Sequence, residues 1–491
     1  MNNKHNIIII PVDNRPVSYT LLETISLLNK NINVLLPPRE ILGGLSTSAV
    51  VGGIFNWLEK VAARKKIDFI ICALDTIAYG GLIPSRWCND TEEEVLSRLE
   101  RLKKLIQTVN SRVLGFSSIL RISDSNVNEE EKQYWDKYGK LIFEFSCLSH
   151  KQELEPENKQ VKERVQEIRR QIPPQVIDDY LKTRQRNFSI NKTYLKWLEQ
   201  GVLDFLILGK DDTAPVGLNI KEAEALQAEI ADKNLNAMLH TGSDEISSLL
   251  LARVLKEIYN REILVYPIYS TPDGSGIIPR YEDQPLHQSV KNHLKVCNLQ
   301  LAGSRTDADM LLLLHTPERV QNDFALGKMT EPENIQAVNF CTDFIKNSDK
   351  PVILADICCA NGSDKILIEK IIEENINLNK LYGYAGWNTA SNSLGCALSI
   401  GITRYIAEKQ DSFSIENFNR LMFVRFADDW GYQSIARQNI RNTADEADEV
   451  LLYREFIPLV EKIAPKFGVD PDKIILSFPW ARTFEVEINF L

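Results

Sequence analysis

Two adjacent aspartates give the clearest chemical signal in the sequence. Asp211 and Asp212 follow the apolar run Phe205–Leu208, which is typical of a buried strand. Because consecutive side chains of a strand point to opposite faces, one carboxyl can enter a pocket while its neighbour reaches over the rim. Different surroundings push the pKa values of two carboxyls apart, which divides acid and base roles between them. The pair therefore predicts acid–base catalysis; the plainer interpretation is a solvated pair beside Lys210.

Polar residues also follow most of the other apolar runs. A single Asp after a strand often caps the next helix, and we interpret Asp244 and Asp364 in this way because each opens a helical pattern. The other residues at such positions form the predicted substrate-binding set: Asp13, Arg15, Asp75, Arg86, Asp356, Asn361, Trp387 and Asn388. A rim of carboxylates, amides and an indole suits a neutral polyhydroxylated ligand. We therefore expect a small carbohydrate as the substrate.

Buried parallel strands are needed to bring these residues together. The candidate strands are short runs rich in Ile, Leu and Val: Ile7–Val12, Ile32–Leu36, Phe69–Leu74, Val113–Leu120, Phe205–Leu208, Ala237–His240, Ile263–Ile268, Met310–His315, Val352–Ile357 and Leu381–Ala385. Such runs are typical of strands that are covered by helices on both faces. Amphipathic helical patterns lie between them, and Thr91 with Glu94 predicts a capping box at the start of one helix. Sites in such folds form where the strands end.

The alternation of strands and helices predicts the α/β class. We expect a (β/α)8-like barrel as the catalytic domain over residues 1–380, with a charged helical insertion at 126–200. A mostly helical C-terminal subdomain is expected over residues 381–491. The candidate strands outnumber the roughly eight of a simple barrel. Either the barrel carries extra strands or a second α/β unit lies in the 260–320 region.

Composition narrows the class of protein. The chain has 491 residues, of which 44% are hydrophobic and 25% charged, as in ordinary globular proteins. Its net charge of −10 argues against nucleic acid as a partner. We expect no membrane span, because no apolar stretch is long enough. The N-terminal apolar run Ile7–Ile10 is too short for a secretory signal, so we expect a cytoplasmic protein.

Known cofactor and metal motifs are missing from the sequence. The eight cysteines are scattered without a CxxC spacing, which favours buried free thiols. There is no Walker, GxGxxG, HExxH or GxSxG pattern. His240 is the best single candidate histidine, although a satisfied histidine at a strand end is the plainer interpretation. We therefore expect neither a cofactor nor a bound metal.

Several segments carry a resemblance to a known family. They are DNRPVSY, LDTIAYGGLIPSR, LGKDDTAPVG, GSDEISSLLLAR, ADICCANGSD and YAGWNTASNSLG, running from Asp13 to Gly395. In these segments the chain resembles a bacterial family catalogued as domain of unknown function 4127. That name implies no activity.

The order of the motifs is also more distantly similar to glycoside hydrolase family 84. Members of that family are β-N-acetylglucosaminidases with a (β/α)8 catalytic barrel. The resemblance implies that Asp211 orients the 2-acetamido group of the substrate and that Asp212 is the general acid. The acetamido oxygen would then attack the anomeric carbon, so no enzyme nucleophile is required.

Three functional hypotheses follow. The leading one is a glycosidase-type hydrolase that acts on carbohydrates, with N-acetylhexosaminides as one expected substrate class. The first alternative is a metal-dependent hydrolase, in which aspartates together with His240 or His315 bind Mg²⁺, Mn²⁺ or Zn²⁺. Its candidate carboxylate ligands are Asp13, Asp75, Asp211, Asp244 and Asp356. The second alternative is a sugar-binding protein without catalytic activity.

Overall fold

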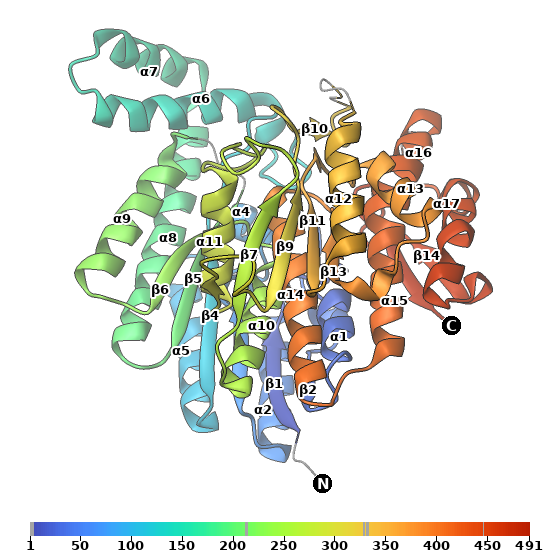
Figure 1. Cartoon of the computed structure of the whole chain (residues 1–491). Coiled ribbons are helices and arrows are strands. Elements are labelled where there is room, and N and C mark those ends of the chain that lie inside the picture. The colour runs from blue at the N-terminus through green and yellow to red at the C-terminus, as the bar shows by residue number, and fades with distance from the viewer. Residues whose placement is uncertain (1–3, 212–214, 328, 330–332, 445) are drawn as a thin grey trace.

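The main strands form two sheets in which the described neighbours pair in parallel (Figure 1). The computed structural model describes residues 4–211, 215–327, 329, 333–444 and 446–491. The first sheet has the order β2-β1-β3-β4-β5-β6, built from β1 (His5–Ile10), β2 (Ile32–Leu35), β3 (Phe69–Ala73), β4 (Arg112–Ile119), β5 (Phe205–Lys210) and β6 (Ala237–Thr241). The second has the order β13-β11-β9-β7-β8, built from β7 (Leu264–Tyr269), β8 (Gln300–Leu301), β9 (Met310–His315), β11 (Val352–Asp356) and β13 (Leu381–Ala385).

Every apolar run that the sequence offered as a strand contributes to one of these sheets. The reason is visible in β1, whose alternate residues enter two different cores. Ile7 and Ile9 pack into a core with α1 (Thr20–Ser26) and α10 (Ile246–Tyr259), among other elements. Ile8 and Ile10 pack into a second core, which includes residues of the helices α2 (Val51–Arg64) and α5 (Glu92–Val109). A strand buried on both faces must be apolar at every position.

The two sheets repeat one topology. Within the first sheet, strands β1 to β5 lie in the spatial order 2-1-3-4-5. Within the second, β7, β8, β9, β11 and β13 are the first to fifth strands along the chain and also lie in the order 2-1-3-4-5. This doubly wound order reverses its winding beside the first strand, between β1 and β3 and again between β7 and β9. Ligands of such sheets bind outside the carboxyl ends of the strands at this switch point.

Helices cover the sheets and fill the connections. Those not yet given are α3 (Leu74–Ala78), α4 (Pro84–Trp87), α6 (Trp135–Leu154), α7 (Lys159–Gln171), α8 (Pro174–Glu199), α9 (Leu218–Asp232), α11 (Leu286–Val296), α12 (Ile335–Asn347) and α13 (Lys365–Glu373). The predicted capping box opens α5, where the side chain of Thr91 accepts from Glu94 N–H and Glu94 reaches back to the N–H of Thr91. The helices α6 and α7 project from one corner of the molecule (Figure 1).

The chain after β13 is again largely helical. It contains α14 (Ala390–Lys409), α15 (Ile415–Phe426), a π-helix at Ala427–Ala436, α16 (Arg437–Thr443) and α17 (Glu449–Ile463). Helix α14 is buried over most of its length, because it packs against β13 on one side and α10 on the other. It therefore joins the two sheets. Short strands complete the fold: a parallel pair, β10 (Asn322–Asp323) and β12 (Cys359–Ala360), and an antiparallel pair, β14 (Ile474–Ser477) and β15 (Glu487–Phe490).

The α/β class with parallel sheets and many helices is confirmed. None of the helices within the described ranges is both long and apolar enough to cross a membrane.

Candidate functional site

A polar pocket lies where the carboxyl ends of the two sheets meet. It encloses about 110 Å³ and opens beside a wider groove of about 810 Å³, with which it shares part of its wall. The pocket is lined by Arg15, Leu82, Ile83, Arg86, Arg121, Glu130, Lys210, Asp211, Thr241, Gly242, Ser243, Asp244, Tyr281, Glu282, Asn388, Thr389, Ser391, Asn392, Arg482 and Phe484. These side chains come from the ends of β5 and β6, from segments after β1, β3, β4, β5 and β6 of the first sheet and after β7 and β13 of the second, and from the segment between β14 and β15.

Polar contacts hold the two sheet ends together at this pocket. Lys210, the last residue of β5, forms an ion pair with Asp283 from the segment after β7. The hydroxyl of Thr241 donates to the same carboxylate at 3.2 Å. Glu282 accepts from the backbone N–H and the hydroxyl of Ser391, both at 2.7 Å. The pocket walls are therefore positioned relative to each other by buried hydrogen bonds.

Arg15 links two carboxylates on one side of the pocket. Its Nε and Nη2 donate to Asp13 at 2.9 and 2.7 Å, and Nη2 also donates to Asp244 at 2.6 Å. Asp13 is therefore engaged in holding Arg15. Burial raises the pKa of Asp244 to about 7, and the charge of Arg15 offsets this only in part. Asp244 thus exists in both protonation states near neutral pH.

Three arginine side chains surround Glu130 on another side of the pocket. Its carboxylate accepts from Arg86 at 2.6 Å, from Arg121 at 2.9 Å and from Arg482 at 2.8 Å. Burial opposes ionisation here, but the three guanidinium charges outweigh it and lower the pKa of Glu130 well below its ordinary value. Arg86 also donates to Asp211 at 2.6 Å. The Asp211 carboxylate is thus fixed in the pocket by an arginine that is 3% exposed.

Like Asp13, the predicted binding residues Asp75 and Asp356 are not among the residues that line the pocket. Asp75, in the short helix α3, accepts from the hydroxyl of Ser117 at 2.6 Å and from Ser118 N–H at 2.8 Å. Asp356, at the end of β11, accepts from the backbone N–H of Asp364 at 2.8 Å. Burial raises the pKa of each to about 6. Asp75 therefore ties the end of β3 to β4, whereas Asp356 holds the segment that leads into α13; both side chains are buried.

The predicted residues after β11 and β13 reach the pocket to different degrees. Asn388 lines both the pocket and the wider groove, and Asn361 lines the groove. Their backbones are joined, because Asn361 N–H donates to the carbonyl of Asn388 at 2.8 Å. Trp387 is buried and packs edge-on against Phe484, which faces the pocket. Asp212 lies outside the described residues.

The two aspartates that were interpreted as helix caps have different roles in the structure. Asp364 does cap α13, since its carboxylate accepts from the N–H groups of Ile366 and Leu367. The interpretation of Asp244 as a cap is wrong. Helix α10 begins at Ile246 without a side-chain cap, and the carboxylate of Asp244 is directed to Arg15 in the pocket.

Sequence reasoning missed several residues of the pocket. Four of them lie in irregular segments, and none directly follows an apolar run: Glu130, Tyr281, Glu282 and Arg482. Arg121 directly follows the fourth run, so its position was available as a signal. The others are brought to the pocket by loop geometry, which a pattern of apolar residues does not record.

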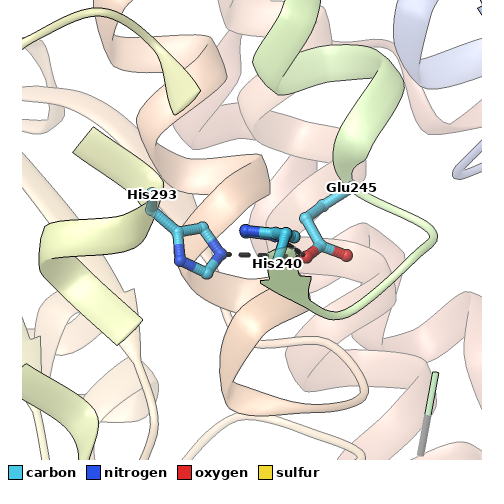
Figure 2. Close-up of side chains that lie close together, drawn as sticks. All are labelled: His240, Glu245 and His293. Carbon is cyan, nitrogen blue, oxygen red and sulfur yellow. Dashed lines mark hydrogen bonds and ion pairs between the residues drawn. The ribbon is translucent and has the colours of Figure 1, made fainter. Parts of the chain in front are cut away.

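Two buried clusters carry side chains that could hold a metal ion. In the first, Nε2 of His240 lies 2.8 Å from Oε1 of Glu245, and Nε2 of His293 lies 3.7 Å from the same oxygen (Figure 2). In the second, His315 lies 2.9 Å from Asp364, with Cys358 beside them. Glu245 and His293 were not predicted as functional residues.

Burial would raise the pKa of Glu245, but its contacts with His240 and His293 lower it to about 2. Burial lowers the pKa of His240. Glu245 is adjacent in sequence to Asp244, and His293 contacts the backbone of Ser391, which lines the pocket. The first cluster therefore lies directly behind the pocket wall.

Comparison with known proteins bears on family and not on activity. No curated protein matches the chain. A family model with the description "Protein of unknown function (DUF4127)" matches residues 7–489. This confirms the resemblance seen in the motifs, and because the match spans nearly the whole sequence, the chain belongs to that family.

Proposed function

We propose that this protein is a glycosidase-type hydrolase whose reaction takes place in the pocket between the two sheet ends. The observation that carries the proposal is a pair of carboxyl groups in the same pocket, Asp211 and Asp244, each ion-paired with a different buried arginine. Asp211 is paired with Arg86, whereas burial raises the pKa of Asp244 to about 7 in spite of its contact with Arg15. Two carboxyls that differ in this way are suited to divide the roles of glycoside hydrolysis.

In this mechanism Asp244 is the general acid; the family 84 resemblance gives this role to Asp212, which stays the other candidate for it. Asp244 donates its proton to the oxygen of the leaving group, and the nearby guanidinium of Arg15 stabilises the carboxylate that remains. Asp211, held by Arg86, orients the 2-acetamido group, as the family 84 resemblance implies. The acetamido oxygen attacks the anomeric carbon as the leaving group departs, and water then hydrolyses the cyclic intermediate and returns a proton to Asp244. Hydroxyls and amides of Ser243, Ser391 and Asn388 offer hydrogen bonds to sugar hydroxyls.

The experiment is a panel of aryl glycosides, including N-acetylhexosaminides, assayed with good and poor leaving groups. Asp244→Asn, Asp212→Asn and Asp211→Asn are compared. Loss of the general acid affects poor leaving groups most, because good ones need little protonation. Asp211→Asn should affect both kinds alike. Equal losses for all variants on every leaving group would remove the support for this division of roles.

A metal-dependent hydrolase that uses the predicted aspartates receives less support. Asp13 binds Arg15, Asp75 accepts from two serines, and Asp211 and Asp244 are paired with arginines. Carboxylates engaged in this way are poor ligands for a cation. A sugar-binding protein without activity stays as the other candidate, and the same panel tests it: saturable binding without turnover would favour it.

Two further points concern the location of the protein and the arrangement of its strands. All eight cysteines are free thiols, which supports a reducing location such as the cytoplasm. The expected (β/α)8-like barrel shares one feature with this structure, namely that segments after β1, β3, β4, β5 and β6 face one ligand site. The order 2-1-3-4-5 within each of the two sheets is that of doubly wound folds.

A further inference from the structure

Three buried side chains from three elements converge behind the pocket. His240 lies on β6, Glu245 directly precedes α10, and His293 lies on α11. Their exposed fractions are 0%, 0% and 1%. Two histidines and a glutamate removed from water form a donor set that binds divalent transition metals.

The spacing of the donor atoms matches such a site. Oε1 of Glu245 lies 2.8 Å from Nε2 of His240 and 3.7 Å from Nε2 of His293. Ligands of a tetrahedral zinc ion with bonds of ~2.0–2.1 Å lie about 3.3 Å from one another. The two observed distances fall on either side of this value, so small side-chain adjustments would place the three donors around one ion.

The surroundings of His293 are unusual for an imidazole without a cation. Its Nδ1 lies 2.7 Å from the carbonyl of Ser289, an orientation typical of metal ligands. Its Nε2 lies 3.1 Å from the carbonyl of Ser391 and faces the carboxylate of Glu245. If the neutral ring donates through Nδ1, the lone pair of Nε2 points toward these oxygens and is repelled by them. A proton or a metal ion on Nε2 would remove this repulsion.

Two further polar atoms of the cluster have free coordination capacity. Oε2 of Glu245 and Nδ1 of His240 are buried and find no hydrogen-bond partner within the described part of the chain. Buried polar atoms without partners are costly and call for an explanation. A metal ion on the carboxylate would engage Oε2 directly.

The backbone leaves room for this carboxylate by means of two glycines. A Cβ at Gly242 would lie 2.1 Å from Oε1 of Glu245, and one at Gly395 would lie 2.4 Å from its Cγ. Gly242 also has a φ of +107°, a conformation that glycine adopts at little cost. The segment after β6 and helix α14 thus approach Glu245 more closely than a side chain would permit.

We propose that His240, Glu245 and His293 bind one divalent transition-metal ion of the zinc class. The ion would connect β6 of the first sheet with α11 of the second half, and would fix the segment between His240 and Glu245. That segment contains Asp244, so the ion supports the pocket from behind. The inference does not depend on the proposed hydrolase reaction, because it concerns binding.

The test measures metal directly in the full-length chain. The chelator-treated protein is loaded with Zn²⁺ or Co²⁺, freed of unbound metal by gel filtration, and analysed for metal content. We expect one equivalent per chain in the wild type and in His287→Gln, a matched control on the same helix. We expect at least about tenfold weaker binding in His293→Gln and Glu245→Gln.

Spectroscopy covers the case in which a variant fails to fold. The Co²⁺ form of the wild type should show visible bands of a nitrogen- and oxygen-ligated ion without thiolate-to-cobalt charge transfer. A thiolate band would place the metal at His315, Cys358 and Asp364 instead and overturn the proposal. A wild type that retains no metal would also overturn it, and would favour an imidazolium–carboxylate pair at His293 and Glu245. Metal binding without glycosidase activity would leave this site intact while refuting the proposed function.

Discussion

The guanidinium of Arg15 lies 2.6 Å from the carboxylate of Asp244, although 229 residues separate them in the chain. Arg15 follows β1 and Asp244 follows β6, so the contact spans the carboxyl edge of the first sheet. It places a permanently charged group beside a carboxyl whose pKa burial raises to about 7. The acid and the counterion of its conjugate base are thereby held together.

Asp244→Asn should lower kcat by roughly 10²–10⁴, the usual contribution of a general acid. In the wild type, activity should fall as pH rises through about 7, because the required form of Asp244 is protonated. This descending limb should be absent in the variant. The pH profile of kcat measures both effects, with Asp232→Asn on the exposed end of α9 as the control. An unchanged limb in Asp244→Asn would exclude this residue as the acid.

Glu130→Ala should destabilise the protein by about 2–4 kcal/mol, because Arg86, Arg121 and Arg482 are left facing each other without their shared carboxylate. Inorganic phosphate should raise the thermal midpoint of this variant more than that of the wild type, since an anion can replace the lost charge. Unfolding with and without phosphate measures this. Glu129→Ala, which removes a half-exposed contact with Arg482, should cost less than about 1 kcal/mol. Equal costs would contradict the special role of Glu130.

Asp75 should make stability depend on pH. Burial raises its pKa in the folded state to about 6, so the folded protein retains a proton that the unfolded chain releases near pH ~4. This contribution is fully present below about pH 4 and is lost as pH rises to about 6. Asp75→Asn does not titrate, so its stability relative to the wild type should increase by on the order of 3 kcal/mol between these limits. Urea unfolding at both pH values checks this, and a difference that is constant with pH would refute it.

Two helical glycines should respond in opposite directions to alanine. Gly395→Ala should destabilise the protein by about 1–3 kcal/mol, because its Cβ would lie 2.4 Å from Cγ of the buried Glu245. Gly52→Ala in α2 meets nothing within 4 Å and should stabilise by about 0.5–1 kcal/mol. Denaturant unfolding measures both. A neutral Gly395→Ala would show that Glu245 can move away, and would weaken the fixed geometry of its cluster.

Much of the fold could be predicted because its causes are local. A strand covered on both faces must be apolar throughout, and each such run in the sequence became a strand of a parallel sheet. The capping box at Thr91 depends on two residues in one turn and was likewise readable. Of the polar residues expected after these strands, four line one pocket: Arg15, Arg86, Asp211 and Asn388.

The tertiary structure alone decided how these parts combine. The division of the strands between two sheets of equal topology depends on pairings across the chain, which apolar runs do not encode. The sequence predicted Asp244 as a helix cap and Asp75 as a binding residue, yet Asp75 accepts from serines beneath the surface and Asp244 faces the pocket. His293 carries no local signal, because its role depends on Glu245, which approaches from the segment that precedes α10. The sequence by itself determined which segments are buried and where chemistry can gather; the direction and partner of each polar side chain depend on long-range contacts, so only the folded chain determined them.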